Sequence, residues 1–303
     1  MILVIVLLMT STLRFPLLLI LILPGTAFAA EPAKLVLALK PDKNPEAMLA
    51  ERAALATALT PLMGKPVDVI VPLSAAVITE GLANGTIDAA HVASTDLAKM
   101  IPDAATAGAA TLLLAVEVNG KTTYSSIWLG MKDQAFDGVE SLKGQRVAFA
   151  SKTSTSGGVV PLYDLSKRGL IPAGKGPDAF FGAGNVWYGT GYVSAVERVL
   201  AGEAVAAAVS DYVFFGDKHL TAEQKATLKV VATQGPVPTH VIAVSRNLSE
   251  ANRTTLKEAL LGLGTSQAAL RDKVFGGPLV TIDEAAHLQP IRAALVVVSA
   301  MPL

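Results

Sequence analysis

The stretch of the sequence with the clearest potential for chemistry is Ser154–Gly158, which reads Ser-Thr-Ser-Gly-Gly. It lies between a predicted strand, residues 146–150, and a predicted helix, residues 159–168. A helix start carries backbone N–H groups without intrahelical partners and the positive end of the helix dipole. Hydroxyl side chains add donors there, which is the chemistry of an oxyanion site. Because Ser and Thr are also the usual N-cap residues, the turn alone favours a plain cap.

The N-terminal residues have the form of a secretory signal peptide. Residues 15–28 are almost wholly apolar, and residues 27–30 form a small-x-small cleavage site. The alternative is a membrane anchor, which two prolines inside the run and the cleavage site both disfavour. We therefore predict a signal peptide over residues 1–29, with the start at Met1 or Met9 left open.

The composition excludes several classes of protein. The chain has 25 basic and 25 acidic residues, which argues against a nucleic-acid partner or an anionic membrane. It has no cysteine, which excludes disulfides, thiol catalysis and a lipid-modified N-terminal Cys. The four His residues lie far apart, so neither a metal site nor a cofactor is predicted. Neither a Gly-x-Ser-x-Gly elbow nor a P-loop motif occurs, so no catalytic residues are predicted.

Strand and helix patterns alternate along the chain and predict the elements that hold the Ser154 turn. Residues 34–92 read as strand, helix, strand, helix and strand, which indicates an α/β lobe with a mostly parallel sheet. A helix beginning at Ser74 is expected to turn Val77 and two later apolar residues inward. A further strand is predicted over residues 179–182.

A weak internal repeat suggests two similar lobes. Residues 82–94 read as helix, glycine stop, small-residue strand and then Ser94. Residues 200–211 repeat the pattern and end on Asp211. Since ligands of open α/β sheets bind outside the carboxyl ends of the strands, both strand ends would face one cleft. A generic strand–helix repeat explains the pattern equally well.

Five stretches, taken in order, carry a resemblance to a known family. The most specific lies within residues 142–161, where Leu-Lys-Gly-x-x-Val-Ala-Phe is followed by Ser-Thr-Ser-Gly. The others are residues 39–48, 85–96, 124–125 and 201–211, with weaker similarity over residues 237–263. Over most of its length the chain resembles the periplasmic substrate-binding proteins of phosphate, phosphite and phosphonate ABC transporters.

This resemblance implies a two-lobed α/β fold, the type II periplasmic binding protein fold. Each lobe is expected to hold a mostly parallel sheet flanked by helices, and two hinge crossings join the lobes. We expect lobe 1 over residues 30–126 plus 241–303, and lobe 2 over residues 127–240. The hinges are expected near residues 124–127 and 234–241. Such proteins close on a small molecule and then dock on a permease of the inner membrane.

The resemblance also implies which residues hold the ligand. In this family the Ser-Thr-Ser helix start binds the phosphoryl oxygens, which carries over to Ser154, Thr155 and Ser156 together with Gly157. With this context the turn is predicted to be both a cap and a binding site.

Four further residues are assigned to the site from the same resemblance. The family's lobe-one tyrosine corresponds to Tyr124, and its acidic residue after a second-lobe strand corresponds to Asp211. Ser94 and Thr95 begin a lobe-one helix that would face the ligand. Asp211 would accept a hydrogen bond from a protonated P–OH group or pair with an amine; a plain N-cap is the alternative.

The chain departs from the family pattern at several positions, among them Tyr192 and His91. Tyr192 stands where the family commonly has a His, and His91 occupies a normally apolar strand position. Both are candidate ligand contacts, although a satisfied core histidine is the favoured explanation of His91. Trp187 and Tyr188 would either line the cleft or pack at the lobe surface. These differences leave the oxyanion or organic ligand unidentified.

Three functions remain open at this point. The leading hypothesis is a monomeric periplasmic binding protein that hands an oxyanion to an ABC permease and does no covalent chemistry. The same clamp would also suit a sensor that reports to a membrane histidine kinase or chemoreceptor. A hydrolase or transferase acting on phosphoryl groups is the third hypothesis.

Overall fold

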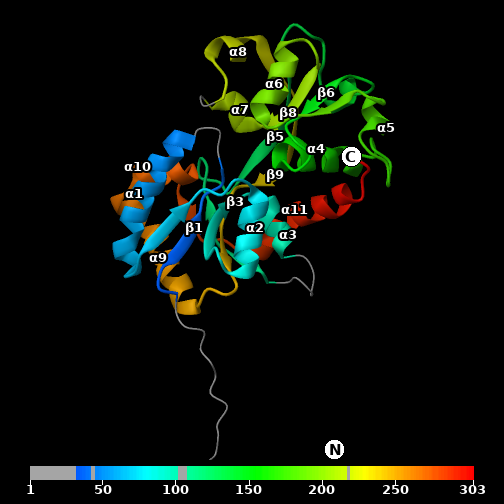
Figure 1. Cartoon of the computed structure of the whole chain (residues 1–303). Helices are drawn as coiled ribbons and strands as arrows, with labels where there is room; N and C mark the ends of the chain where they lie inside the picture. The colour runs from blue at the N-terminus through cyan, green and yellow to red at the C-terminus, as the bar shows by residue number, and fades with distance from the viewer. Residues whose placement is uncertain (1–31, 42–44, 102–107, 217–218) are drawn as a thin grey trace, which may run out of the picture. The chain divides into compact units, whose positions relative to one another are not determined.

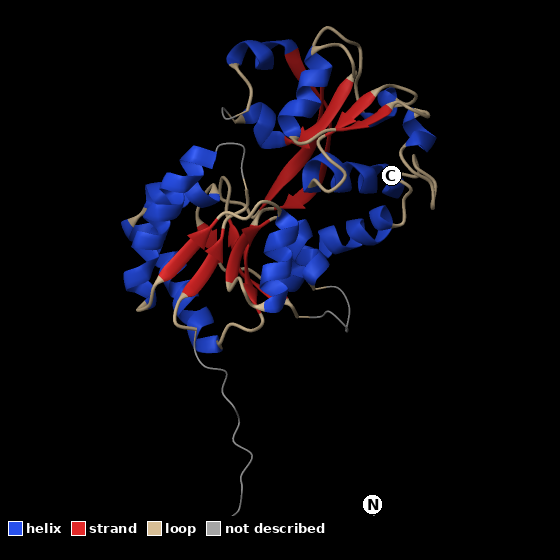
Figure 2. Cartoon of the chain, in the orientation of Figure 1, coloured by secondary structure: helices blue, strands red, loops and turns tan. Residues whose placement is uncertain are grey.

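The computed structural model describes residues 32–41, 45–101, 108–216 and 219–303. The predicted signal peptide lies outside these described residues. Within them, two β-sheets carry helices on their faces (Figure 1 and Figure 2). None of the described helices combines the length and apolar character needed to cross a membrane.

The first sheet has six strands in the order β11-β4-β10-β3-β1-β2. β1 is parallel to β2 and β3, whereas β10 is antiparallel to β3 and β4, and β11 is antiparallel to β4. The strands are β1 (Leu35–Ala38), β2 (Val67–Ile70), β3 (Ala89–Val92), β4 (Ala110–Val116), β10 (Val241–Ser245) and β11 (Leu279–Val280).

The second sheet has five strands in the order β7-β6-β8-β5-β9. β6 is parallel to β7 and β8, and β5 is antiparallel to β8 and β9. The strands are β5 (Thr123–Met131), β6 (Val147–Phe149), β7 (Val186–Tyr188), β8 (Ala206–Ser210) and β9 (Leu228–Pro238).

Both sheets are mixed, so the expectation of mostly parallel sheets was wrong in this detail. Parallel neighbours require a long crossover connection, usually a helix. The antiparallel strands β5 and β10 instead follow direct crossings between the two sheets. The chain passes from β4 to β5 through a tight turn with Asn119 and Gly120 at positive φ, and from β9 to β10 through residues 239–240. The two-lobed α/β fold class is confirmed. The predicted boundary after residue 126 falls inside β5, and the one after residue 240 falls between β9 and β10.

Capping residues set the starts of several helices as the sequence predicted. Ser74 accepts a hydrogen bond from the backbone of Val77 at the start of α2, and Ser249 caps α9 in the same way. Val77 itself is 47% exposed, so the prediction that it faces inward was wrong. The helices are α1 (Pro45–Met63), α2 (Ala75–Asn84), α3 (Ser94–Met100), η1 (Val139–Leu142), η2 (Thr155–Val159), α4 (Val160–Lys167), α5 (Asp178–Phe181), α6 (Tyr192–Leu200), α7 (Asp211–Phe215), α8 (Ala222–Thr227), α9 (Glu250–Ser266), α10 (Ala268–Phe275) and α11 (Glu284–Ser299).

The predicted strand over residues 179–182 is also wrong, because this segment forms the short helix α5. Phe180 and Phe181 are both buried, so the apolar run carries no alternation that would separate strand from helix. Pro177 and Asp178 start the turn, which is the signal that decides the segment in favour of a helix.

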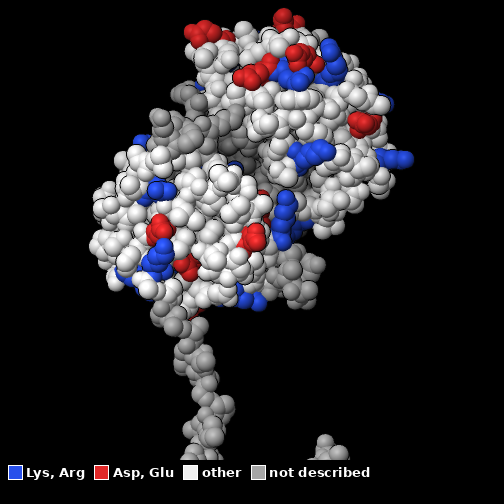
Figure 3. All heavy atoms as spheres, viewed as in Figure 1, with Lys and Arg blue, Asp and Glu red and all other residues white. Residues whose placement is uncertain are grey.

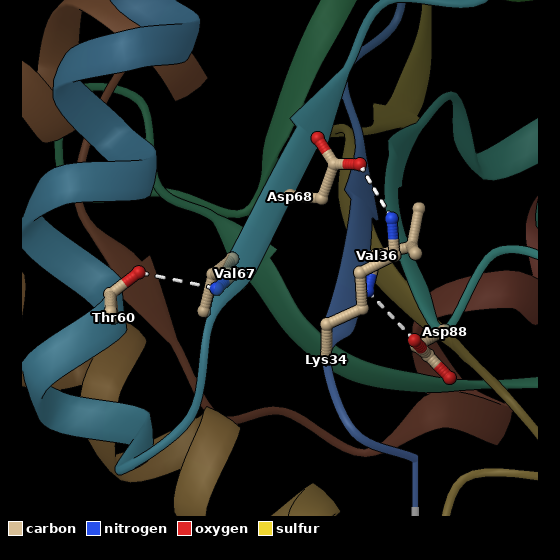
Figure 4. A network of polar contacts seen from close by, with 6 residues as sticks. All are labelled: Lys34, Val36, Thr60, Val67, Asp68 and Asp88. Atoms are coloured by element: carbon tan, nitrogen blue, oxygen red, sulfur yellow. Dashed lines mark hydrogen bonds and ion pairs between the residues drawn. The ribbon is translucent and has the colours of Figure 1, made fainter.

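Polar contacts fix the amino-terminal edge of the first sheet (Figure 4). An Asp88 carboxylate oxygen accepts a hydrogen bond from the backbone N–H of Val36 at 2.7 Å. Lys34 and Asp68 form an exposed ion pair at 3.0 Å between β1 and β2. These contacts tie the strands together near their amino ends. The candidate site lies at the other end of the sheet, where β3 leads into α3.

Candidate functional site

Three strands end at helix starts that carry the predicted site residues. β3 leads into α3 at Ser94, β6 leads into η2 at Thr155, and β8 leads directly into α7 at Asp211. β3, β6 and β8 are fully buried, so both faces of each strand are covered. Their carboxyl ends place polar side chains where ligands of α/β sheets commonly bind.

The Ser154 turn is a helical cap with tight packing. Ser154 Oγ accepts a hydrogen bond from the Gly157 N–H at 3.1 Å, and Val160 donates to the Thr155 carbonyl. A Cβ on Gly157 would lie 2.4 Å from the Ala150 side chain. Glycine is therefore required by close approach to β6, and the predicted capping role of Ser154 is confirmed.

A chain of hydroxyl groups runs through the buried side chain of Ser156. Its Oγ lies 2.9 Å from the Tyr192 hydroxyl and accepts a bond from the Tyr124 hydroxyl at 3.4 Å. Ser126 donates from its side chain to the Ser156 carbonyl oxygen, and Gln234 donates to Ser126 Oγ at 2.7 Å. The structure thus brings together three residues that the sequence predicted separately.

A second hydroxyl contact joins the two sheets. Thr95 Oγ1, on α3, lies 2.8 Å from Thr155 Oγ1, on η2. Both threonines are buried, with exposed fractions of 1% and 8%. The predicted approach of the α3 start to the Ser154 turn is therefore present through Thr95.

The phenols of Tyr124 and Tyr212 are held in their neutral form. Burial, followed by the nearby Tyr192, raises the pKa of Tyr124 well above its usual value. Burial and Tyr192 also raise the pKa of Tyr212. These hydroxyl groups consequently remain hydrogen-bond donors at neutral pH.

Tyr212 is a neighbour of the site that the sequence reading missed. Its ring centroid lies 5.7 Å from that of Tyr192 and 6.0 Å from that of Tyr124. The His219 ring packs on the same side, 5.6 Å from Tyr212. The available signal was the position of Tyr212, directly after the strand end at Asp211.

Asp211 serves as an internal acceptor in this structure. Its Oδ2 accepts a hydrogen bond from the Ser125 N–H at 2.8 Å, and its Oδ1 accepts one from Ser210 Oγ at 3.4 Å. Ser210 is the N-cap of α7 and makes no side-chain capping bond. Asp211 therefore ties α7 to β5, which places it next to Tyr124.

Two predicted site residues point elsewhere. Ser94 Oγ donates to the Thr239 carbonyl oxygen and lies 3.4 Å from His287 Nε2, so it contacts the crossing between β9 and β10. His91 is buried against the rings of His240 and Phe275, at centroid distances of 5.3 and 5.5 Å. Among the described residues, neither side chain makes a hydrogen bond to η2.

Burial keeps the imidazoles of this region neutral. Desolvation, with a smaller effect from Lys40, lowers the pKa of His91 to about 3. The same two causes lower the pKa of His240, and the neighbouring His91 lowers it further. The Nε2 atom of His91 has no partner among the described residues. Burial and ring contacts place His91 in the core, but within the described part of the chain it lacks the hydrogen-bond partner at Nε2 that a satisfied core histidine has.

The two aromatic residues of β7 pack on the surface of the second sheet. The Arg198 guanidinium lies 4.1 Å from the Trp187 ring centroid. Tyr188 stacks on Phe149 at 5.3 Å, with the Lys152 ammonium 5.3 Å from its ring centroid. These contacts favour packing of Trp187 and Tyr188 at the lobe surface over a position lining the cleft.

Metal ligands and charge clusters do not mark this site. In the described part of the chain no group of three or more His, Cys, Asp or Glu side chains could hold a metal ion. On the face shown in Figure 3, Lys and Arg side chains are interspersed with Asp and Glu. The hydroxyl cluster is therefore the main chemical feature at the carboxyl ends of β3 and β6.

Comparison with protein families gives the class of this protein. Residues 37–283 match the family described as ABC transporter, phosphonate, periplasmic substrate-binding protein. The chain belongs to this family of phosphonate-type periplasmic binding proteins, whose members bind small molecules for ABC permeases. The family places its members in the periplasm, and its members and structural neighbours are binding proteins.

Solved structures agree with this fold. XAC2383 from Xanthomonas citri bound to ATP matches with a TM-score of 0.73 at 18% identity, covering 88% of this chain and 98% of that one. PhnD1 from Prochlorococcus marinus in complex with methylphosphonate matches with a TM-score of 0.71 at 15% identity, covering 89% and 100%. The aliphatic sulphonate binding protein SsuA from Escherichia coli matches with a TM-score of 0.60 at 16% identity, covering 88% and 92%.

Proposed function

We propose that this chain captures a tetrahedral oxyanion of the phosphate, phosphite or phosphonate type for an ABC importer. The observation that carries the proposal is the buried hydroxyl of Ser156, within hydrogen-bonding distance of the Tyr192 and Tyr124 hydroxyls. Beside it, Thr95 and Thr155 bring hydroxyls from the two sheets together. These groups form a compact set of neutral donors at a helix start.

Neutral hydroxyls suit a ligand that exists in several protonation states. A hydroxyl both donates and accepts, so it can bond to P–O⁻ and to P–OH alike. In this role Ser154, Thr155 and Ser156, with Gly157 as the close-packed turn residue, hold the anion. The Asp211 carboxylate accepts two hydrogen bonds within the protein and has further acceptor capacity for a protonated ligand oxygen.

The relatives with known ligands support this class of ligand and leave its identity open. The structures named above contain ATP and methylphosphonate, and SsuA is an aliphatic sulphonate binding protein. All three ligand types present a tetrahedral phosphorus or sulfur with several oxygen atoms. Ser94 and His91 receive no support from the geometry as ligand contacts.

A thermal-shift screen tests the proposal. The purified protein is heated with phosphate, phosphite, methylphosphonate, aminoethylphosphonate, sulfate, arsenate and small organic acids. A ligand at 100 times its Kd stabilises the folded state by about 2.7 kcal/mol, which appears as a rise in Tm. If no oxyanion in this set raises Tm, the proposal is wrong.

A double variant assigns the effect to the turn. Ser154→Ala with Ser156→Ala should abolish the ligand-induced rise in Tm, because both remove hydroxyls from the proposed anion site. Ser266→Ala, at the exposed end of α9, is the matched control and should keep it. Unchanged binding in the double variant would leave Ser154 as a cap and Ser156 as a structural partner of Tyr192 and Tyr124.

We also propose that the mature protein is a periplasmic monomer that does no covalent chemistry. Residues 1–29 would be removed as a signal peptide, which N-terminal sequencing of the protein from a periplasmic extract tests. Size-exclusion chromatography with light scattering tests the monomer. Incubation with phosphoesters and phosphonates should give binding without product, and turnover would overturn the proposal that the protein does no covalent chemistry.

The gene neighbourhood separates import from sensing. Neighbouring permease and ATPase genes favour import, whereas neighbouring kinase genes favour sensing.

A further inference from the structure

The last helix, α11, contacts both halves of the fold. It packs against α3 of the first sheet and against α4 and η2 of the second (Figure 1). Near its start, His287 Nε2 lies 3.3 Å from the Thr239 carbonyl oxygen, at the crossing between β9 and β10. The chain therefore links the two sheets through α11 in addition to its two crossings.

One face of α11 is buried along its whole length. The buried side chains recur at helical spacing and continue past the helix end: Leu288, Ile291, Ala294, Val298 and Met301. They belong to a hydrophobic cluster that also holds Leu97 of α3 and Leu165 of α4. Since this cluster is shared, separating the sheets would expose apolar surface on α11.

The residues after α11 are seated on the second-sheet side. The Leu303 carbonyl oxygen accepts a hydrogen bond from Lys152 Nζ at 2.9 Å. The Pro302 carbonyl lies so close to the buried Gly176 that a Cβ there would be 2.2 Å from its oxygen. Val298 and Met301 are only 4% and 9% exposed. The backbone φ of Gly176 is not positive, so backbone conformation does not require glycine there. The close approach of the Pro302 carbonyl does.

The start of α11 is packed less closely. A cavity of about 240 Å³ lies between the first turn of α11 and the crossing segments. Its lining includes Thr122, Pro236, Pro238, Ile282 and Pro290. This space is open to solvent, whereas the far end of the helix is packed against Gly176.

We propose that the segment Val298–Leu303 is a latch that holds the two lobes together and slows ligand release. Opening a two-lobed protein rotates one lobe about its crossings. Because α11 packs on α3 at one end and on Gly176 at the other, this rotation must lift the latch from its seat. The effect on ligand release rests on the proposed function, whereas the effect on the lobes does not.

Two variants break the seat by different means. Gly176→Ala places a methyl group against the Pro302 carbonyl, and Lys152→Met removes the hydrogen bond to Leu303 from an exposed position where folding is not at risk. The matched controls are Gly262→Ala, where a Cβ meets nothing within 4 Å, and Lys175→Met at an exposed lysine.

The first measurement uses no ligand. The chain has no cysteine, so Leu73→Cys and Phe215→Cys, at side chains 97% and 70% exposed on the two halves, can each carry a fluorophore. Single-molecule energy transfer should show a larger inter-lobe distance in a greater share of molecules for Gly176→Ala, with a smaller shift for Lys152→Met. Distance distributions equal to those of the controls would overturn the latch.

The second measurement uses methylphosphonate as the probe. Its dissociation should be about tenfold faster from Gly176→Ala than from either control, since mutational changes in affinity arise mainly in the dissociation rate. If no oxyanion binds the unsubstituted protein but the ligand-free distances still shift, the latch stands and the proposed function fails. If methylphosphonate binds and neither distances nor dissociation change, the function stands and the latch is wrong.

Discussion

The starts of α3 and η2 carry similar residues and use them differently. At α3 the N-cap is Ala93, which makes no side-chain bond, and Ser94 turns its hydroxyl to the Thr239 carbonyl at the crossing. At η2, Ser154 caps the turn, while Ser156 joins the hydroxyls of Tyr124 and Tyr192. A contact between Thr95 and Thr155 joins the two starts.

The neighbouring strands explain this difference. β3 lies beside β10, so the α3 start faces the crossing that enters β10. β6 lies beside β8, so the η2 start faces the strand end that carries Asp211 and Tyr212. The neighbouring strand end therefore decides whether a hydroxyl at a helix start bonds to the crossing, as in Ser94, or joins the hydroxyl cluster, as in Ser156.

The largest expected difference between the two regions is their response to acid. His91 has a pKa of about 3 in the folded protein and 6.5 as its usual value. Between these values the unfolded chain binds a proton that the folded chain does not, so stability falls as pH is lowered through this range. At pH 4 the loss from His91 amounts to about 3 kcal/mol relative to pH 7.

Urea denaturation at pH 7 and pH 4 measures this loss. His91→Leu should lose less stability between the two values than the unsubstituted protein. Tyr124→Phe is the control from the η2 region, because the raised pKa of that phenol keeps it neutral throughout this range. Equal acid losses for all three proteins would contradict the assigned role of His91.

The next effect concerns packing, which is tight at η2. Gly157→Ala should lower the free energy of unfolding by about 2–3 kcal/mol, because the new methyl group meets Ala150 and the Ala208 carbonyl. Gly262→Ala in α9 is the control, and it should raise stability by up to about 1 kcal/mol, since alanine favours a helix. Denaturant titration measures both, and a neutral Gly157→Ala would show that the turn can relax.

A smaller effect separates ligand chemistry from structural chemistry. Ser156→Ala should weaken oxyanion binding by about 1.5–3 kcal/mol, the range for a hydrogen bond to a charged group. Ser94→Ala should leave affinity unchanged, since its hydroxyl bonds to the crossing. Isothermal titration calorimetry with the best ligand of the thermal-shift screen measures both, and equal losses would remove the distinction between the two helix starts.

The smallest effect tests the contact between Thr95 and Thr155 at the two starts. A double-mutant cycle of Thr95→Val and Thr155→Val should give a coupling of about 1 kcal/mol in the free energy of unfolding. Thr57→Val is the control partner for Thr95→Val, because the exposed Thr57 hydroxyl bonds within α1. Additive losses in the Thr95–Thr155 cycle would show that the two hydroxyls do not interact in solution.

The sequence predicted much of the fold because its signals are local. Ser74 and Ser249 each start a helix with a side-chain cap, and Asn119-Gly120, a typical turn pair, forms a turn at positive φ. It failed where local patterns are ambiguous. The buried run at residues 179–182 has no periodicity, and the direction of β10 depends on a crossing that carries no local signal.

For the site, the sequence by itself determined the residue types at the strand ends and hence the chemistry of neutral hydroxyl donors. Capping and strand-end placement follow from short-range backbone geometry, so Ser154 and Asp211 could be located without a fold. Only the tertiary structure decided that Ser156 meets Tyr192 while Ser94 faces Thr239, and that α11 binds both sheets. These contacts join residues far apart in the chain, and sheet order, which periodicity does not encode, sets them.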